Sequence, residues 1–181
     1  MELETKFMAA PGPLKVVDGE RIEGYASLFG ATDQGGDVVT AGAYGRSLRA
    51  LGERGGRVKM LWQHDPSQPI GVWDEVREDA KGLYVKGRIL TDVTRGREAA
   101  ALVSAGAIDG LSIGYRTVRA TKDKGGRRHL SELELWEVSL VTFPMLPQAR
   151  VAAKGETSPG DADWRELARV FDQARAGLAG D

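Results

Sequence analysis

The chain has 181 residues, of which 41% are hydrophobic and 28% charged, and its 25 basic and 26 acidic residues give a formal net charge of −1. The absence of cysteine excludes disulfides, thiolate nucleophiles and cysteine-based zinc sites, and two widely separated histidines argue against a histidine-built metal centre. The balanced charge gives no general attraction for nucleic acid, no apolar run is long enough to span a membrane, and the acidic N-terminus does not resemble a signal peptide. We therefore expect one intracellular globular domain.

The first half of the chain predicts short strands separated by turns. Runs of aromatic and apolar residues between turn residues predict strands at 3–9, 21–30, 57–64, 70–79 and 82–90. The last two are expected to form a hairpin around Asp79–Gly82. A glycine-rich loop is expected at 31–39, and 41–51 shows a helical spacing of apolar residues that glycines weaken.

The second half predicts one firm helix and two long strands. The helix is expected over 92–106, with Thr94 as N-cap and Gly106 at its end. Strands at 108–120 and 129–144 flank an exposed hairpin. We expect a domain over 1–153, followed over 154–181 by a linker and an amphipathic helix. The fold class expected is mainly β with α: an antiparallel sheet closed into a barrel, with a few helices outside it.

Three polar residues interrupt apolar strand runs. His64 ends "VKMLWQH", Ser112 lies within "GLSIGY", and Glu137 lies within "LWEVSLVTF". Burying any of them without a partner costs about 1–3 kcal/mol, so a shared site would satisfy all three.

Together these residues suit nucleophilic catalysis. Serine needs an adjacent base, histidine with its ordinary pKa of about 6.5 can act as that base, and a carboxylate fixes the imidazole tautomer and stabilises the imidazolium. Ser112, His64 and Glu137 supply one candidate for each role. Gly110 and Gly114 are expected to let a substrate backbone approach the serine.

Each residue also has a purely structural interpretation. A serine within a strand often only fills space, a histidine beside Asp-Pro often belongs to a turn, and a strand glutamate usually faces solvent. His129 is a rival base, but it follows Gly-Gly-Arg-Arg in the exposed hairpin. An esterase with a nucleophile elbow is disfavoured because "GLSIG" lies in a strand pattern rather than at a strand-to-helix turn.

Five stretches of the sequence carry a family resemblance. They are "GYASLFGATDQGGDVVTAGAY", "VKMLWQHDPSQPIGVW", "GLYVKGRIL", "GAIDGLSIGYRT" and "LWEVSLVTFPMLPQARV". Together they span roughly Ile22 to Val151, and the chain resembles the prohead maturation proteases of tailed bacteriophages. The resemblance implies a serine endopeptidase with the barrel fold of herpesvirus assemblin.

The resemblance also assigns roles to residues. It implies Ser112 as nucleophile, His64 as general base and Glu137 in the place of the second histidine of the herpesvirus enzymes. Arg150 is a candidate contributor to the oxyanion hole, with a surface arginine as the alternative. No cofactor or metal is implied.

The same resemblance implies a biological setting. Such proteases act inside the immature capsid, in the cytoplasm of the bacterial host, where they cut the scaffold or the scaffold segment of the major capsid protein precursor and commonly themselves. A homodimer is left open, and no nucleic-acid or membrane partner is implied. The alternative is a non-catalytic β-barrel that binds capsid or scaffold as a structural component.

Overall fold

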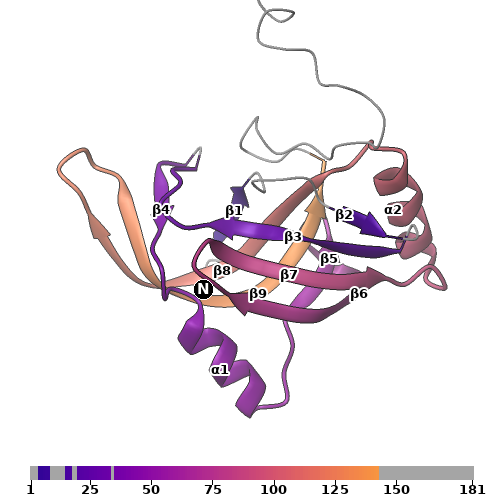
Figure 1. Ribbon diagram of the computed structural model, residues 1–181, viewed down its shortest axis with the longest axis horizontal. Helices are drawn as coiled ribbons and strands as arrows, with labels where there is room; N and C mark the ends of the chain where they lie inside the picture. Colours follow the sequence, from indigo (N-terminus) through magenta and orange to yellow (C-terminus); the bar gives the residue numbers. More distant parts are fainter. Residues whose placement is uncertain (1–3, 9–14, 18–19, 34, 143–181) are drawn as a thin grey trace, which may run out of the picture.

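The computed structural model describes residues 4–8, 15–17, 20–33 and 35–142. The described chain forms a mainly β fold with two helices (Figure 1). In chain order the elements are β1 (Glu4–Met8), β2 (Lys15–Val17), β3 (Arg21–Leu28), β4 (Asp37–Val39), α1 (Gly45–Glu53), β5 (Lys59–Trp62), β6 (Asp65–Glu78), β7 (Gly82–Ile89), α2 (Thr94–Ser104), β8 (Gly110–Lys122) and β9 (Arg128–Val141).

All described strands belong to one strongly curled sheet. Its order is β1-β8-β9-β5-β6-β7-β3-β2, with β4 added beside β9. The neighbours are antiparallel except for β4–β9 and β5–β9, which are parallel. The mainly β class with outer helices is confirmed. The sheet is a curled half-barrel, and within the described ranges no ladder joins its end strands β1 and β2 (Figure 1).

The structure confirms some of the local predictions and corrects others. The hairpin at Asp79–Gly82 is confirmed, because the Asp79 carboxylate accepts the backbone N–H groups of Lys81 and Gly82. Gly106 follows α2 in a left-handed conformation, as a helix stop requires. Thr94 is not the N-cap: that position is Val93, without a side-chain cap. The loop expected at 31–39 contains the short strand β4. The linker and helix expected at 154–181 lie outside the described residues.

A bulge in β9 decides which side chains face the core. Side chains alternate between the two faces of a strand, and Leu133, Leu135, Val138 and Leu140 all belong to the core. The three-residue step between Leu135 and Val138 requires one extra residue, and the pairing with β8 shifts at this point. Burial of each of these apolar side chains contributes about 1.5–3 kcal/mol, which opposes a slip of the register. Trp136 and Glu137 therefore both lie on the face opposite the core.

Candidate active site

Strands β8 and β9 and the turn after β5 bring the three predicted side chains together. Ser112 pairs with Ser139 across the β8–β9 ladder, and the parallel β5–β9 ladder ends at Trp62, two residues before His64. The distance from His64 Nε2 to Ser112 Oγ is 2.7 Å, and that from His64 Nδ1 to Glu137 Oε1 is 2.5 Å. A carboxylate, an imidazole and a hydroxyl thus form a continuous hydrogen-bonded chain.

A strained turn carries the imidazole to this position. Gln63 and His64 have φ angles of 51° and 62°, a left-handed conformation that costs a non-glycine residue about 1–3 kcal/mol. The Gln63 backbone N–H donates to the Leu140 carbonyl (2.9 Å), and its side-chain amide donates to Thr142 Oγ1 (2.6 Å). The His64 backbone N–H donates to Ser139 Oγ (3.2 Å). These bonds attach the turn to the end of β9 and hold the strained residues in place.

The Glu137 carboxylate is buried, with both oxygens hydrogen-bonded. Glu137 is 4% exposed. Its Oε1 faces His64 Nδ1, and its Oε2 accepts the hydroxyl hydrogen of the fully buried Ser139 (2.5 Å). Because an ionised carboxylate only accepts hydrogen bonds, the ring hydrogen lies on Nδ1 and the Nε2 lone pair is directed at Ser112. This tautomer is the one that a general base beside a serine requires.

Gly114 makes room for that carboxylate. Glu137 is its partner across the β8–β9 ladder. A Cβ at Gly114 would overlap Glu137 Oε1 and lie 2.7 Å from its Cδ. Glu137 thus fills the space that a side chain at Gly114 would need. The expectation that Gly114 admits a substrate backbone stays a prediction. Because Gly114 has no side chain, the Glu137 carboxylate fits against β8 and lies within hydrogen-bonding distance of His64.

The other candidate residues lie elsewhere. His129 is in the β8–β9 hairpin, with Nε2 3.3 Å from Asp123 Oδ2. Arg150 lies outside the described residues. No group of three histidine, aspartate or glutamate side chains in the described part is arranged to hold a metal ion. Among the described helices, none is both long and apolar enough to cross a membrane.

Ser139 is the residue at this site that the sequence interpretation missed. Its hydroxyl contacts both the Glu137 carboxylate and the His64 backbone. The signal was available, since a residue two positions after Glu137 in a strand points to the same face. A serine in an apolar strand is often only a space-filling residue, so the pattern alone does not distinguish Ser139 from a structural serine.

A hydroxyl, an imidazole and a buried carboxylate in this order are the side-chain arrangement of serine hydrolases. Comparison with known proteins identifies the family. The family model described as caudovirus prohead serine protease matches residues 13–160, and the chain belongs to this family. The resemblance inferred from the sequence is thereby confirmed.

Individual relatives extend the comparison. The chain is 35% identical over 141 residues to the prohead protease of Enterobacteria phage HK97, covering 75% of this chain and 61% of that protein. It is 31% identical over 104 residues to the capsid polyprotein of Pseudomonas phage PAJU2, covering 53% of this chain and 15% of the polyprotein. The chain therefore spans less than two thirds of the length of either relative.

A solved structure shares the fold. The bacteriophage T4 capsid assembly protease superimposes with a TM-score of 0.64 at 16% identity, covering 79% of this chain and 98% of that one. At this level of identity the similarity concerns the arrangement of strands and helices. The curled sheet is thus the fold of a phage capsid protease.

Proposed function

We propose that this protein is a serine endopeptidase that cleaves the capsid protein precursor and its scaffold segment, and also itself, during procapsid maturation. The observation that carries the proposal is the hydrogen-bonded chain from Ser112 Oγ through the His64 ring to Glu137, with distances of 2.7 and 2.5 Å. Family membership supports the reaction class. The substrate class is supported by relatives named as a prohead protease and a capsid polyprotein.

In the proposed mechanism, Ser112 Oγ attacks the carbonyl carbon of the scissile peptide bond while His64 Nε2 takes the hydroxyl proton. The tetrahedral intermediate collapses as the imidazolium returns that proton to the leaving amine, which leaves an acyl-enzyme. Water, deprotonated by His64, then releases the acid and regenerates the serine. Glu137 holds the tautomer and stabilises the imidazolium formed in each half of the reaction.

The proposal includes the finer features that the family resemblance implies. The fold is of the herpesvirus assemblin type, with Glu137 in the place of the second histidine, and Arg150 contributes to the oxyanion hole. The enzyme acts within the immature capsid in the cytoplasm of the bacterial host. A homodimer is compatible with this account.

Co-expression with the matching capsid protein tests the proposal. The wild-type chain should cut the capsid protein, and Ser112→Ala should leave it at full length on a gel. Ser67→Ala is the matched control, because Ser67 is exposed and hydrogen-bonds to Asp65. Unchanged cutting by Ser112→Ala would show that the nucleophile is another residue. A wild-type chain that binds capsid protein but never cuts it would favour the non-catalytic alternative.

A further inference from the structure

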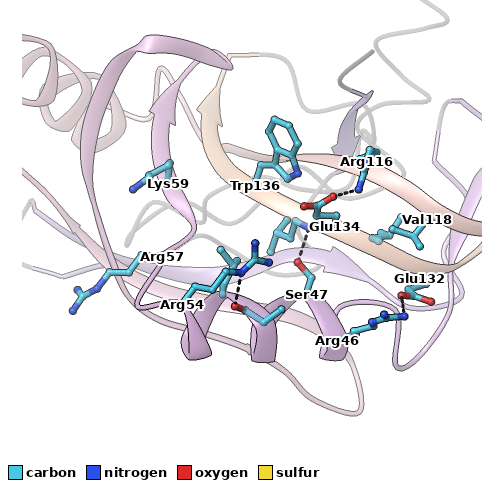
Figure 2. A pocket seen from close by; sticks show the side chains of 14 residues that line it. Arg46, Ser47, Arg54, Arg57, Lys59, Arg116, Val118, Glu132, Glu134 and Trp136 are labelled. Carbon is cyan, nitrogen blue, oxygen red and sulfur yellow. Dashed lines mark hydrogen bonds and ion pairs between the residues drawn. The ribbon is translucent and has the colours of Figure 1, made fainter. Parts of the chain in front are cut away.

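A groove beside the candidate site has no role in the mechanism above. It has a volume of about 650 Å³ and lies between α1, the start of β5 and the strands β8 and β9 (Figure 2). Strand β5 pairs with β9 only over Glu137–Leu140. Helix α1 lies beside the preceding part of β9, where the Leu135 backbone N–H donates to Ser47 Oγ (2.9 Å). The groove is thus built from regular elements on both sides.

The groove lies on the same face of the sheet as Ser112 and Glu137. Alternation along β8 places Arg116 and Ser112 on one face, and the β9 bulge places Trp136 beside Glu137. In the parallel β5–β9 ladder, Lys59 is the partner of Glu137. At about 3.3 Å per residue, the four steps from Ser112 to Arg116 cover about 13 Å. An extended polypeptide lying over Ser112 would reach the groove within a few residues.

Part of the groove wall is exposed apolar surface. Trp136 is 41% exposed and Val118 is 51% exposed, and both line the groove. Figure 2 shows the indole of Trp136 to the left of Arg116, with the Glu134 carboxylate between them. A partly exposed tryptophan in a concave site is a typical anchor for a bound polypeptide. The groove therefore favours an apolar side chain of a ligand.

The charged residues of the groove are predominantly basic. Its two carboxylates are already paired: Glu132 with Arg46 at 3.0 Å and Glu134 with Arg116 at 2.5 Å. Three more cations line the groove without a carboxylate partner in the part of the chain that the structure describes: Arg54, Arg57 and Lys59. An excess of cations on a concave surface attracts acidic ligands and accelerates their association.

We propose that this groove binds an acidic segment of the polypeptide substrate and thereby helps to select the cleavage site. The inference rests on the proposed endopeptidase function. The segment carries at least one aspartate or glutamate within about six residues of the scissile bond, given the strand spacing between Ser112 and the groove. An apolar side chain near that acid packs on Trp136, while the acid meets Arg57 and Lys59.

The test compares the full-length chain with a charge-reversed variant, Arg57→Glu with Lys59→Glu. Both residues are exposed, so the fold should tolerate the change. The matched control is Arg21→Glu with Lys122→Glu, which reverses two exposed cations outside the groove. Each protein digests a peptide library derived from a proteome, and mass spectrometry locates the cuts. The uncharged pair Arg57→Gln with Lys59→Gln is a milder variant for the same assay.

The wild-type and control proteins should cut preferentially where an acidic residue lies within about six positions of the bond. The charge-reversed variant should lose this preference, and its KM for the best acidic peptide should rise about tenfold with a smaller change in kcat. An unchanged preference would overturn the inference. A loss of self-association with an unchanged preference would identify a second copy of the chain as the occupant, which also overturns it.

A serine-directed fluorophosphonate separates this outcome from failure of the proposed function. If the wild-type and charge-reversed proteins both take up the label at Ser112 and share one peptide preference, the groove inference alone fails. If the wild-type protein takes up no label and cuts no peptide, the proposed function itself fails.

Discussion

The two histidines of the chain each face a carboxylate, and their surroundings differ. The His64 and Glu137 side chains are 10% and 5% exposed and lie 2.5 Å apart, whereas the His129 and Asp123 side chains are 34% and 24% exposed and lie 3.3 Å apart. His64 presents its other nitrogen to Ser112. In the described part of the chain, no serine hydroxyl contacts the His129 ring.

This difference in burial and in the third partner separates the proposed active site from an ordinary hairpin ion pair. An exposed pair is screened by solvent and contributes little to stability, whereas burial strengthens electrostatic interactions and fixes geometry. Asp123 also accepts bonds from Arg127 and from the Gly125 backbone, as a hairpin turn requires. The buried pair belongs to a hydrogen-bonded chain that ends at Ser112, the proposed nucleophile, and the exposed pair closes a turn.

The largest expected effect comes from removing each ring in turn. His64→Ala should lower the rate of substrate cleavage by about 10⁴-fold or more, because the serine loses its base. His129→Ala should leave the cleavage rate near that of the wild type. Rates are measured on a peptide taken from a mapped cut, with circular dichroism to verify folding. Equal losses in the two variants would mean that the buried pair has no special role.

Gly114→Ala tests whether the position of the carboxylate matters. The new methyl group would displace Glu137 from His64, and a misplacement of about 1 Å in an active site costs about 10²-fold in kcat. Adding Glu137→Asp, which shortens the side chain, should recover part of the loss. Gly52→Ala is the control, because a Cβ there meets nothing within 4 Å. Full activity in Gly114→Ala would show that the carboxylate needs no such fit.

Ser139→Ala should have a smaller effect. The substitution removes the hydrogen bonds of the Ser139 hydroxyl with the His64 backbone N–H and with one Glu137 oxygen, which costs about 1–3 kcal/mol and lowers kcat about tenfold. Ser139→Thr keeps the hydroxyl and should restore most of the activity. The pH profile of kcat/KM should also move in Ser139→Ala, since the carboxylate beside the imidazole loses a donor. Loss of stability with an unchanged kcat and pH profile would make Ser139 purely structural.

The smallest effect is expected at the hairpin. Hydrogen bonds from His129 and Arg127 lower the pKa of Asp123 to about 2. Since the unfolded value is about 3.9, the resulting stabilisation is fully present above about pH 4 and is lost as the pH falls toward 2. Between about pH 4 and pH 2, the melting temperature of Asp123→Asn should therefore fall less than that of the wild type. Its activity at neutral pH should be unchanged. An activity loss in Asp123→Asn would connect the hairpin to the site.

The sequence predicted the parts of the site that have local signatures. Ser112, His64 and Glu137 each interrupt an apolar strand run, and the glycine-containing hairpins are marked by their turn residues. The left-handed turn at Gln63 and His64 has no glycine or asparagine to mark it, and long-range bonds to β9 hold it in place. Those bonds depend on the tertiary fold and are invisible in local patterns.

Long-range pairing is also the reason why parts of the fold have no local signature in the sequence. The parallel pairing of β5 with β9 joins segments about 80 residues apart in register, and nothing in the local sequence specifies that partner. The bulge at Trp136 and the role of Gly114 depend on a second long-range pairing, the β8–β9 ladder, in which Gly114 is the partner of Glu137. The basic groove could not be predicted either, because α1, β5, β8 and β9 bring its cations together from separate segments.

Mapping a serine-directed label tests the central claim most directly. The full-length protein is treated with a fluorophosphonate, and the modified peptide is identified by mass spectrometry. The account predicts one label per chain on Ser112, with uptake abolished in His64→Ala and retained in His129→Ala. A label on another serine, or an active protein in which Ser112 stays unmodified, would contradict the account.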